Sequence, residues 1–310
     1  MMISCIGVHH SVSELFPPDV LQRALDGLSA EIRVVQAPNT LDICDAVVTF
    51  AYDEAFLNAD LVWIHSIQSG VDRFPLNELE ERGIALTSSA GIHGDSVGET
   101  VAGCMLQFAR RLHVYRTNEH RQEWRYPPWD AAFTLAGESC CVVGLGTLGQ
   151  GIAMRADVLG MHVSGVRRSP IPVDHVERVY TTEELDEALA EALFVVLAIP
   201  LTERTRHLIG ADELAVMRDD AYLINVARGS VVDEAALVQT LQEEKLAGAA
   251  LDVFEEEPLP AESPLWELEN VIVTPHAAAA TREYSARIAA LVRENTRRLA
   301  AGESLVNPVL

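Results

Sequence analysis

Short apolar runs recur along the first third of the chain, separated by polar segments with helical or turn spacing. Five of these runs have the length and the β-branched content of buried strands: 3–8, 32–36, 46–50, 61–65 and 84–87. The segment 18–28, which follows a proline-rich break, has helical spacing. Strands that alternate with helices are typical of a parallel sheet covered on both faces. We therefore predict a first α/β domain in this part of the chain.

A long helical pattern follows from 97 to about 125, where apolar residues recur at intervals of three and four. The proline-rich stretch 126–129 ends it. Beyond it we expect helices at 150–159, 211–218 and 233–245, alternating with strands at 140–143, 161–166, 194–199, 222–226, 249–253 and 271–274. This order predicts a second doubly wound parallel sheet of about six strands, so the fold class is α/β. A last helix, 281–300, is long enough to return to the first domain, which gives two connections and a cleft between the domains.

A glycine-rich turn joins the strand at 140–143 to the helix that follows it. The turn reads Gly144-Leu145-Gly146-Thr147-Leu148-Gly149. Gly144 permits the tight turn, Gly146 lets a pyrophosphate approach the backbone, and Gly149 brings the helix close to the strand. The amides from Thr147 to Gly149 open the helix at the positive end of its dipole, so they can hold phosphates without a lysine. In this strand-helix-strand context the turn indicates a dinucleotide site, whereas alone it could serve only to reverse the chain.

The strand after this helix ends in Arg167, Arg168 and Ser169, where folds that bind NAD usually place an Asp or Glu. Guanidinium groups suit bidentate contacts to phosphate, and a charge-assisted hydrogen bond contributes roughly 1.5–3 kcal/mol. We therefore expect NADP(H) as the cofactor and NAD(H) as a weaker alternative. The other interpretation is a solvated arginine pair at a strand end.

Three polar side chains follow strands that we expect to share one sheet, namely Arg228, Glu257 and His276. Carboxyl ends of parallel strands meet at one edge of a sheet, where ligands bind. A carboxylate favours the protonated form of a neighbouring imidazole, which can then give a proton to a keto oxygen as a hydride arrives. An arginine can bind the substrate carboxylate and polarise the carbonyl. The structural alternatives are that Arg228 is a surface residue paired with Glu234, that Glu257 is a solvated loop acid, and that His276 is a core histidine.

These motifs together closely resemble those of the D-2-hydroxyacid dehydrogenase family, from about Leu61 to Pro275. The matching segments are 144–149, 199–202 with Thr205, 225–229, 251–254 with 257–260, and 274–276. The resemblance implies that His276 is the proton donor, Glu257 its partner and Arg228 the substrate anchor. It also implies that Asp252 faces the nicotinamide amide. The other residues expected at the sites are Pro200, Thr205, Val226, Ala227 and Ala278 for the cofactor, and Ser69, Gly70 and Val71 for the substrate carboxylate.

The resemblance further implies a flavodoxin-like substrate domain, residues 1–97 plus 284–310, and a Rossmann cofactor domain, residues 98–283. Homodimers joined through the cofactor domains, with closure of the cleft on binding, are implied in the same way. Two features depart from the family pattern: the arginine pair at 167–168, and the alanine run 277–280 that follows His276. The lack of a C-terminal regulatory domain argues against the phosphoglycerate branch of the family.

The expected activity is that of an oxidoreductase, the NADPH-dependent reduction of 2-keto acids to D-2-hydroxy acids. Plausible pocket residues are Tyr52, His65, Gln68 and Trp129, and glyoxylate, hydroxypyruvate and larger keto acids all remain open as substrates. One alternative is a non-catalytic, nicotinamide-sensing protein of the corepressor type on the same fold, which has no need of Arg228, Glu257 and His276 together. A formate-type oxidation is a further alternative, but such enzymes usually lack a carboxylate at the position of Glu257.

Composition narrows the possible partners and the compartment. The 310-residue chain has a net charge of −23, which argues against nucleic acids and acidic membranes as partners. Lys245 is the only lysine, and this acidic, lysine-poor composition resembles that of proteins from halophilic organisms, although an acidic protein from a GC-rich genome is the alternative.

The cysteines and the first residues favour a reduced, soluble protein of the cytoplasm. The five cysteines lie in apolar runs without a Cys-x-x-Cys pair: Cys5, Cys44, Cys104, Cys140 and Cys141. The N-terminal residues lack the features of a signal peptide, and no apolar stretch reaches about 18 residues. No metal site is expected, because adjacent histidines such as His9 and His10 point to opposite faces of a strand.

Overall fold

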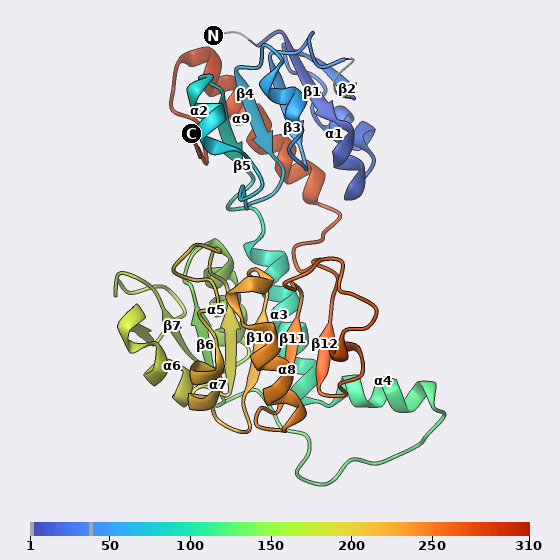
Figure 1. Cartoon of the computed structure of the whole chain (residues 1–310), viewed down its shortest axis with the longest axis vertical. Coiled ribbons are helices and arrows are strands. Elements are labelled where there is room, and N and C mark those ends of the chain that lie inside the picture. Colours follow the sequence, from blue (N-terminus) through green and yellow to red (C-terminus); the bar gives the residue numbers. More distant parts are fainter. Residues whose placement is uncertain (1–2, 37–39) are drawn as a thin grey trace. The chain divides into compact units, whose positions relative to one another are not determined.

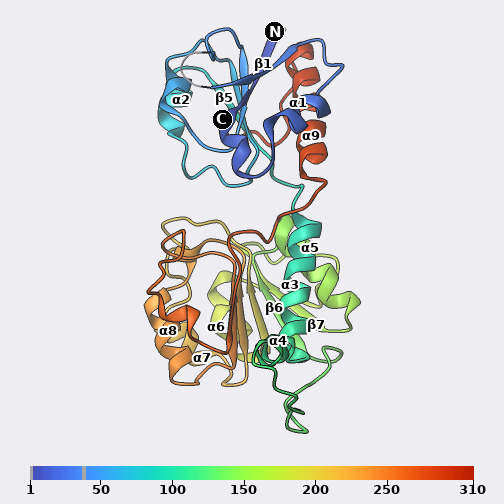
Figure 2. The same cartoon turned by 90° about the vertical axis from the view of Figure 1, so that its right-hand side faces the viewer.

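The computed structural model describes residues 3–36 and 40–310, and these form two compact α/β units (Figure 1). One unit comprises the described residues up to Ile92 together with Thr281–Leu310, and the other comprises His93–Ala280. Each unit contains one parallel sheet with helices on both faces, as Figure 2 shows for each unit separately. The predicted fold class, two doubly wound parallel-sheet domains, is thus confirmed.

The first unit has a five-stranded sheet in the order β2-β1-β3-β4-β5, which is the flavodoxin-like order. Its strands are β1 (Cys5–His9), β2 (Glu31–Val35), β3 (Ala46–Thr49), β4 (Trp63–Ser66) and β5 (Ala85–Ser88). Its helices are α1 (Pro18–Ala24), α2 (Leu76–Glu81) and α9 (Tyr284–Ala301), with short 3-10 turns η1 (His10–Glu14) and η2 (Glu54–Leu57). Helices α1 and α9 lie on one face and α2 on the other (Figure 2). The five strands agree with the five apolar runs. Strands β1, β3, β4 and β5 are buried along almost their whole length, whereas the edge strand β2 is largely exposed.

The second unit has a seven-stranded sheet in the order β12-β11-β10-β9-β6-β7-β8, which contains the Rossmann order of strands. Its strands are β6 (Ser139–Val143), β7 (His162–Val166), β8 (Arg178–Tyr180), β9 (Phe194–Leu197), β10 (Tyr222–Asn225), β11 (Gly248–Leu251) and β12 (Val271–Val273). The sequence predicted about six strands and missed β8. That strand has three residues and pairs only through β7 at the sheet edge, so it carries no apolar run.

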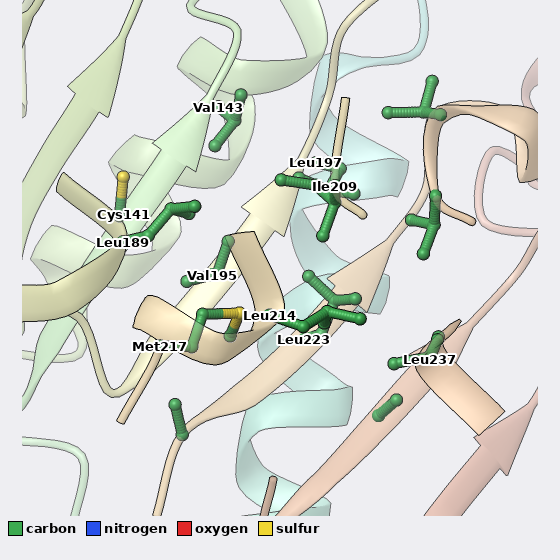
Figure 3. Close-up of a cluster of buried hydrophobic side chains, with 14 of the residues drawn as sticks. Cys141, Val143, Leu189, Val195, Leu197, Ile209, Leu214, Met217, Leu223 and Leu237 are labelled. Atoms are coloured by element: carbon green, nitrogen blue, oxygen red, sulfur yellow. The ribbon is translucent and has the colours of Figure 1, made fainter. Parts of the chain in front are cut away.

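Helices cover both faces of this second sheet (Figure 2). They are α3 (Gly94–Ala109), α4 (Leu112–His120), α5 (Thr147–Val158), α6 (Leu185–Glu191), α7 (Ala211–Val216) and α8 (Glu234–Gln242), with 3-10 turns η3 (Thr182–Glu184), η4 (Gly229–Val231) and η5 (Pro264–Trp266). The face under α6, α7 and α8 is filled by aliphatic side chains, among them Leu189, Leu214 and Leu237 (Figure 3). This packed core holds the strand ends in register, and the candidate site lies on the loops that follow them.

The predicted helix from 97 to about 125 is wrong, because the chain breaks it near position 110. Helix α3 ends at Ala109, and Arg111 has the left-handed φ of 57° before α4 begins. The Ala109 carbonyl accepts a hydrogen bond from the Phe133 amide at 2.9 Å, and Phe133 belongs to the returning chain. The Arg110 guanidinium also donates to the Phe133 carbonyl at 3.2 Å. A contact with a residue more than twenty positions away therefore ends this helix, and helical periodicity does not report it.

Candidate active site

The glycine turn at the end of β6 has the geometry that its three glycines predict. Gly144 has a φ of 100°, and a Cβ there would lie 2.4 Å from the Ile199 side chain. A Cβ on Gly149 would lie 1.8 Å from the Gly144 carbonyl oxygen, so only glycine lets α5 approach the strand this closely. A Cβ on Gly146 would meet open space. The backbone at the start of α5 is therefore accessible, and the residues fit a dinucleotide whose phosphates lie against the first amides of this helix.

The predicted 2′-phosphate residues begin directly beside this turn. The Gly144 amide donates to the Val166 carbonyl at 2.9 Å, and Arg167 is the next residue. The Arg167 amide in turn donates to the Tyr180 carbonyl of β8 at 3.0 Å, which holds the start of the loop after β7. Arg168 and Ser169 are exposed. Within residues 3–36 and 40–310 no carboxylate forms an ion pair with Arg167 or Arg168, so their role in cofactor choice stays a prediction with a suitable location.

The Glu257 and His276 side chains form an ion pair on the loops after β11 and β12. Glu257 Oε2 lies 2.8 Å from His276 Nδ1, and Glu257 Oε1 accepts a hydrogen bond from the Phe254 amide at 3.1 Å. The side chains are 27% and 40% exposed, respectively. His276 has a left-handed φ of 52°, and its amide donates to the Asp252 carbonyl at 2.8 Å. Both the backbone and the ring of His276 are thus held by the loop that follows β11.

Arg228 lies on the loop after β10, next to the loop that carries Glu257. Asn225 shapes the Arg228 loop, because its side-chain oxygen accepts from the Ala227 amide and its side-chain nitrogen donates to the Arg228 carbonyl, at 3.0 and 3.1 Å. A Cβ on Gly229 would lie 1.9 Å from the Phe254 carbonyl carbon, so the two loops are in backbone contact. The register pairs β10 with β11 and β11 with β12 at their carboxyl ends. The structure therefore brings Glu257 and His276 together and places Arg228 on the adjacent loop.

Asp252 supports the His276 loop, a role that the sequence did not reveal. Its buried carboxylate accepts three hydrogen bonds: from the Thr274 hydroxyl at 2.6 Å and from the Ala277 and Ala278 amides at 2.8 and 2.9 Å. All three donors belong to the segment around His276. A buried aspartate within the apolar run Leu251-Asp252-Val253 is the one signal in the sequence for such a bond. Its predicted contact with the nicotinamide amide stays a prediction.

The other predicted cofactor residues line the loops at the same edge of the sheet. The Thr205 hydroxyl donates to the Pro200 carbonyl at 2.7 Å and accepts from the Thr202 amide at 2.8 Å, so it stabilises the loop after β9. Val226 and Ala227, at the start of the Arg228 loop, are buried. Direct contact of these residues with a cofactor stays a prediction.

A second imidazole–carboxylate pair, also missed from the sequence, joins two of these loops. His207 Nε2 lies 2.8 Å from Glu255 Oε1, and the Glu255 amide donates to Glu234 at 3.1 Å. The pair connects the loop after β9 to the loop after β11. Glu255 lies two residues before Glu257, so His207 is a useful comparison for His276.

The predicted substrate residues Ser69, Gly70 and Val71 lie in the first unit, on the loop after β4. Ser69 is exposed, whereas Gly70 and Val71 are partly buried. The Val71 carbonyl accepts from the Phe74 amide at 3.0 Å, which folds this loop into a turn. Their role in holding a carboxylate stays a prediction.

One of the four suggested pocket residues, His65, is a core residue of the first unit. His65 is fully buried, with Nδ1 2.8 Å from the Thr87 hydroxyl and Nε2 3.0 Å from the Ser89 hydroxyl. Burial lowers the pKa of His65 to about 3, so it is a neutral core histidine. The suggestion for His65 is corrected, since a fully buried side chain forms no pocket wall. Trp129 is 93% exposed in the segment after α4, and its role stays a prediction.

Residues 3–36 and 40–310 contain no helix that is both long and apolar enough to cross a membrane. The same residues contain no group of three histidine, cysteine or acidic side chains arranged to hold a metal ion.

Comparison with known proteins identifies the family. Residues 102–278 match the family model described as the NAD binding domain of D-isomer specific 2-hydroxyacid dehydrogenases. The chain is 37% identical over 242 residues to a D-3-phosphoglycerate dehydrogenase of Methanocaldococcus jannaschii, covering 77% of this chain but only 46% of that protein. It is 35% identical over 280 residues to a glyoxylate reductase of Korarchaeum cryptofilum, covering 85% and 83% of the two chains.

The fold also matches that of solved structures. An NADPH-dependent glyoxylate/hydroxypyruvate reductase of Sinorhizobium meliloti, solved with NADP and sulfate, superposes with a TM-score of 0.83 at 28% identity, covering 99% of this chain and 98% of that one. The matched family segment spans β6 to β12 and carries the glycine turn, Arg228, Glu257 and His276. The chain therefore belongs to the D-isomer specific 2-hydroxyacid dehydrogenase family.

Proposed function

We propose that this protein reduces 2-keto acids, such as glyoxylate or hydroxypyruvate, to D-2-hydroxy acids with NADPH. The observation that carries the proposal is the Glu257–His276 pair at 2.8 Å, on the loops after β11 and β12, at the edge of the sheet where the Arg228 loop also lies. A non-catalytic, nicotinamide-sensing protein on the same fold has no use for such a pair. The relatives named as glyoxylate reductases support the substrate class.

Each residue of the set has a role in this reaction. When bound, the nicotinamide cofactor supplies a hydride to the carbonyl carbon. Glu257 holds the proton on His276 Nδ1 through the ion pair, so His276 can give the proton on Nε2 to the keto oxygen. Arg228 binds the substrate carboxylate and polarises the carbonyl. In the first unit, Ser69 and the amides of Gly70 and Val71 are the proposed ligands of the same carboxylate.

The proposed preference for NADPH rests on the loop after β7. Arg167, Arg168 and Ser169 offer two guanidinium groups and a hydroxyl at a position where a carboxylate would repel a 2′-phosphate. The first amides of α5, at Thr147, Leu148 and Gly149, are the proposed ligands of the pyrophosphate. NAD(H) is the weaker alternative, because it lacks the phosphate that the arginines would bind.

The direct test is the loss of NADPH absorbance in the presence of glyoxylate, hydroxypyruvate or pyruvate, at low and at high salt. Turnover that produces the D-hydroxy acid supports the proposal. Tight NADPH binding without turnover of any 2-keto acid would instead favour the nicotinamide-sensing alternative.

We also propose a homodimer that forms through the second unit. The segment 121–134, which extends away from the sheet after α4 (Figure 1), exposes Trp124, Tyr126 and Trp129 at 102%, 92% and 93%. Between positions 110 and 125, five arginines and two glutamates give a local charge of +3, in a chain whose net charge is −23. This exposed aromatic arm follows the basic stretch 110–125, and together they complement the acidic surface of a second copy.

The proposed compartment is the cytoplasm, and the proposed working condition is a high salt concentration. All five cysteines are free and buried, which favours the reducing cytoplasm. The excess of acidic residues favours a halophilic protein, in which salt screens self-repulsion within about 3 Å at 1 M. Loss of structure on dilution below about 0.5 M salt supports this, and stability that is independent of salt contradicts it.

A further inference from the structure

Helix α3 packs directly against α5, the helix whose first amides are the proposed ligands of the pyrophosphate (Figure 2). A Cβ on Gly98 would collide with the Gly151 carbonyl, and one on Gly94 would lie 2.9 Å from the carbonyl oxygen of Thr147, the first residue of α5. Only glycine lets two helix backbones approach this closely. The start of α3 and the start of α5 are therefore fixed relative to each other.

The same helix holds the chain after His276 through one hydrogen bond. The Thr100 hydroxyl donates to the Ala278 carbonyl at 3.0 Å, across 178 positions of the sequence. A threonine within a helix commonly donates to a carbonyl three or four positions earlier in its own helix. A hydroxyl has one proton, so the bond to Ala278 takes the place of that local bond. The proton of Thr100 is thus committed to the segment that carries His276.

Ala278 has both of its backbone polar groups engaged by other elements. Its amide donates to Asp252 Oδ2 at 2.9 Å, and its carbonyl accepts from Thr100. The residue is 4% exposed and belongs to the apolar cluster that contains Val101 and Met105 of α3. Alanine side chains have no polar atom, so the run 277–280 cannot fix its own backbone by side-chain hydrogen bonds. The position of this run therefore depends on Asp252 on one side and on α3 on the other.

These two supports tie the segment to different parts of the unit. Asp252 follows β11 and ties it to the loop that carries Glu257. Thr100 ties it to α3, which is fixed against the start of α5. Only one residue separates His276 from Ala278, so a shift of the Ala278 backbone passes on to His276. Such a shift would move the His276 ring relative to a cofactor whose phosphates lie on α5.

We propose that Thr100 is a positioning residue, which holds the proton donor His276 at the correct distance from the bound cofactor. Thr100 acts through the Ala278 carbonyl and not on the reacting atoms themselves. Proton and hydride transfer both require close alignment of the reacting groups, and a misplacement of about 1 Å can slow a reaction roughly 10²-fold. This inference rests on the proposed reductase function and assigns a further residue to it.

The experiment compares Thr100→Val with Thr100→Ser. Valine has nearly the shape of threonine but no proton for the Ala278 carbonyl, whereas serine keeps the hydroxyl. For each variant the single-turnover rate is measured at saturating NADPH with the best substrate among the tested 2-keto acids, so that product release does not mask the chemical step. Thr240→Val is the matched control, because Thr240 is a helical threonine of the same unit whose hydroxyl donates to the Ala236 carbonyl of its own helix at 2.8 Å.

We expect Thr100→Val to lower the single-turnover rate by about 5- to 30-fold. The steady-state KM for NADPH should change by less than about threefold, since the phosphates stay on α5. Thr100→Ser should stay within about threefold of the unmodified protein, and Thr240→Val within about twofold. Thr100→Ala, which lacks both the hydroxyl and the volume of threonine, should lose at least as much as Thr100→Val. Circular dichroism checks that each variant is folded.

A double-mutant cycle separates positioning from a general effect on the fold. Once His276→Ala has removed the proton donor, no ring is left to position. Thr100→Val should therefore slow the His276→Ala variant by less than about twofold. A residue that only stabilised the fold would produce the same loss in both backgrounds.

Other results overturn the inference. An unchanged single-turnover rate in folded Thr100→Val, or a loss that Thr100→Ser shares in full, means that the hydroxyl does not position His276. Equal losses from Thr100→Val with and without His276 assign Thr100 to the fold, as does a failure of both Thr100→Val and Thr100→Ala to fold. The proposed reductase function fails separately, through the absence of turnover of every 2-keto acid by the unmodified protein, and this inference then fails with it.

Discussion

Replacement of Glu257 by glutamine tests how the ion pair contributes to catalysis. Glutamine keeps the shape of the side chain and an oxygen that can accept from His276 Nδ1, so the geometry at 2.8 Å is preserved while the charge is lost. A charge-assisted hydrogen bond contributes roughly 1.5–3 kcal/mol and a neutral one roughly 0.5–1.5 kcal/mol. Because the side chains of Glu257 and His276 are 27% and 40% exposed, solvent places the difference at the lower end, about 1–1.5 kcal/mol.

The expected loss in kcat for Glu257→Gln is therefore about 5- to 15-fold. His276→Ala removes the proton donor itself and should lower kcat by roughly 10²- to 10⁴-fold, with the affinity for NADPH little changed. The assay is single-turnover reduction of glyoxylate at saturating NADPH, which isolates the chemical step from product release. His207→Ala removes the neighbouring imidazole–carboxylate pair and serves as the matched control, with an expected loss smaller than that of His276→Ala.

Two results would refute this reasoning. If Glu257→Gln were as slow as His276→Ala, the carboxylate would do more than hold a proton on the ring. If His276→Ala reduced glyoxylate at the parent rate, His276 would have no part in proton transfer.

Three further predictions concern the cofactor, the core and the arm. Replacing Arg167 and Arg168 with alanine should raise the KM for NADPH by tenfold or more and change that for NADH little, since only NADPH has the 2′-phosphate; parallel changes in steady-state kinetics would exclude this role. The pKa of His65 is about 3 in the folded state and 6.5 in the unfolded state, so its contribution to the free energy of unfolding is complete above pH 6.5 and is lost as the pH falls. Urea unfolding should show the free energy of unfolding decrease by about 2.5 kcal/mol between pH 7 and pH 4.5. The same pH dependence in His65→Gln would contradict this assignment. Replacing Trp124 and Trp129 with serine should give a monomer in sedimentation velocity, and a dimer that persists would assign the interface elsewhere.

Much of the fold and of the candidate site could be predicted from local patterns. Strands that are buried on both faces are mostly apolar, so β1, β3, β4 and β5 of the first sheet each left a visible run. The glycine turn was equally readable, because a Cβ on Gly144 or Gly149 would collide with backbone or side chains. The three residues Arg228, Glu257 and His276 each follow a strand, so the parallel topology alone placed them at one edge.

Contacts between distant residues decided the rest. The Phe133 amide ends α3, the hydroxyls of Thr87 and Ser89 make His65 a core residue, and Asp252 holds the segment around His276. Periodicity along a chain reports which side of an element is buried. It carries no information on which polar groups form hydrogen bonds across the fold. Those hydrogen bonds depend on how the packed strands bring their loops together.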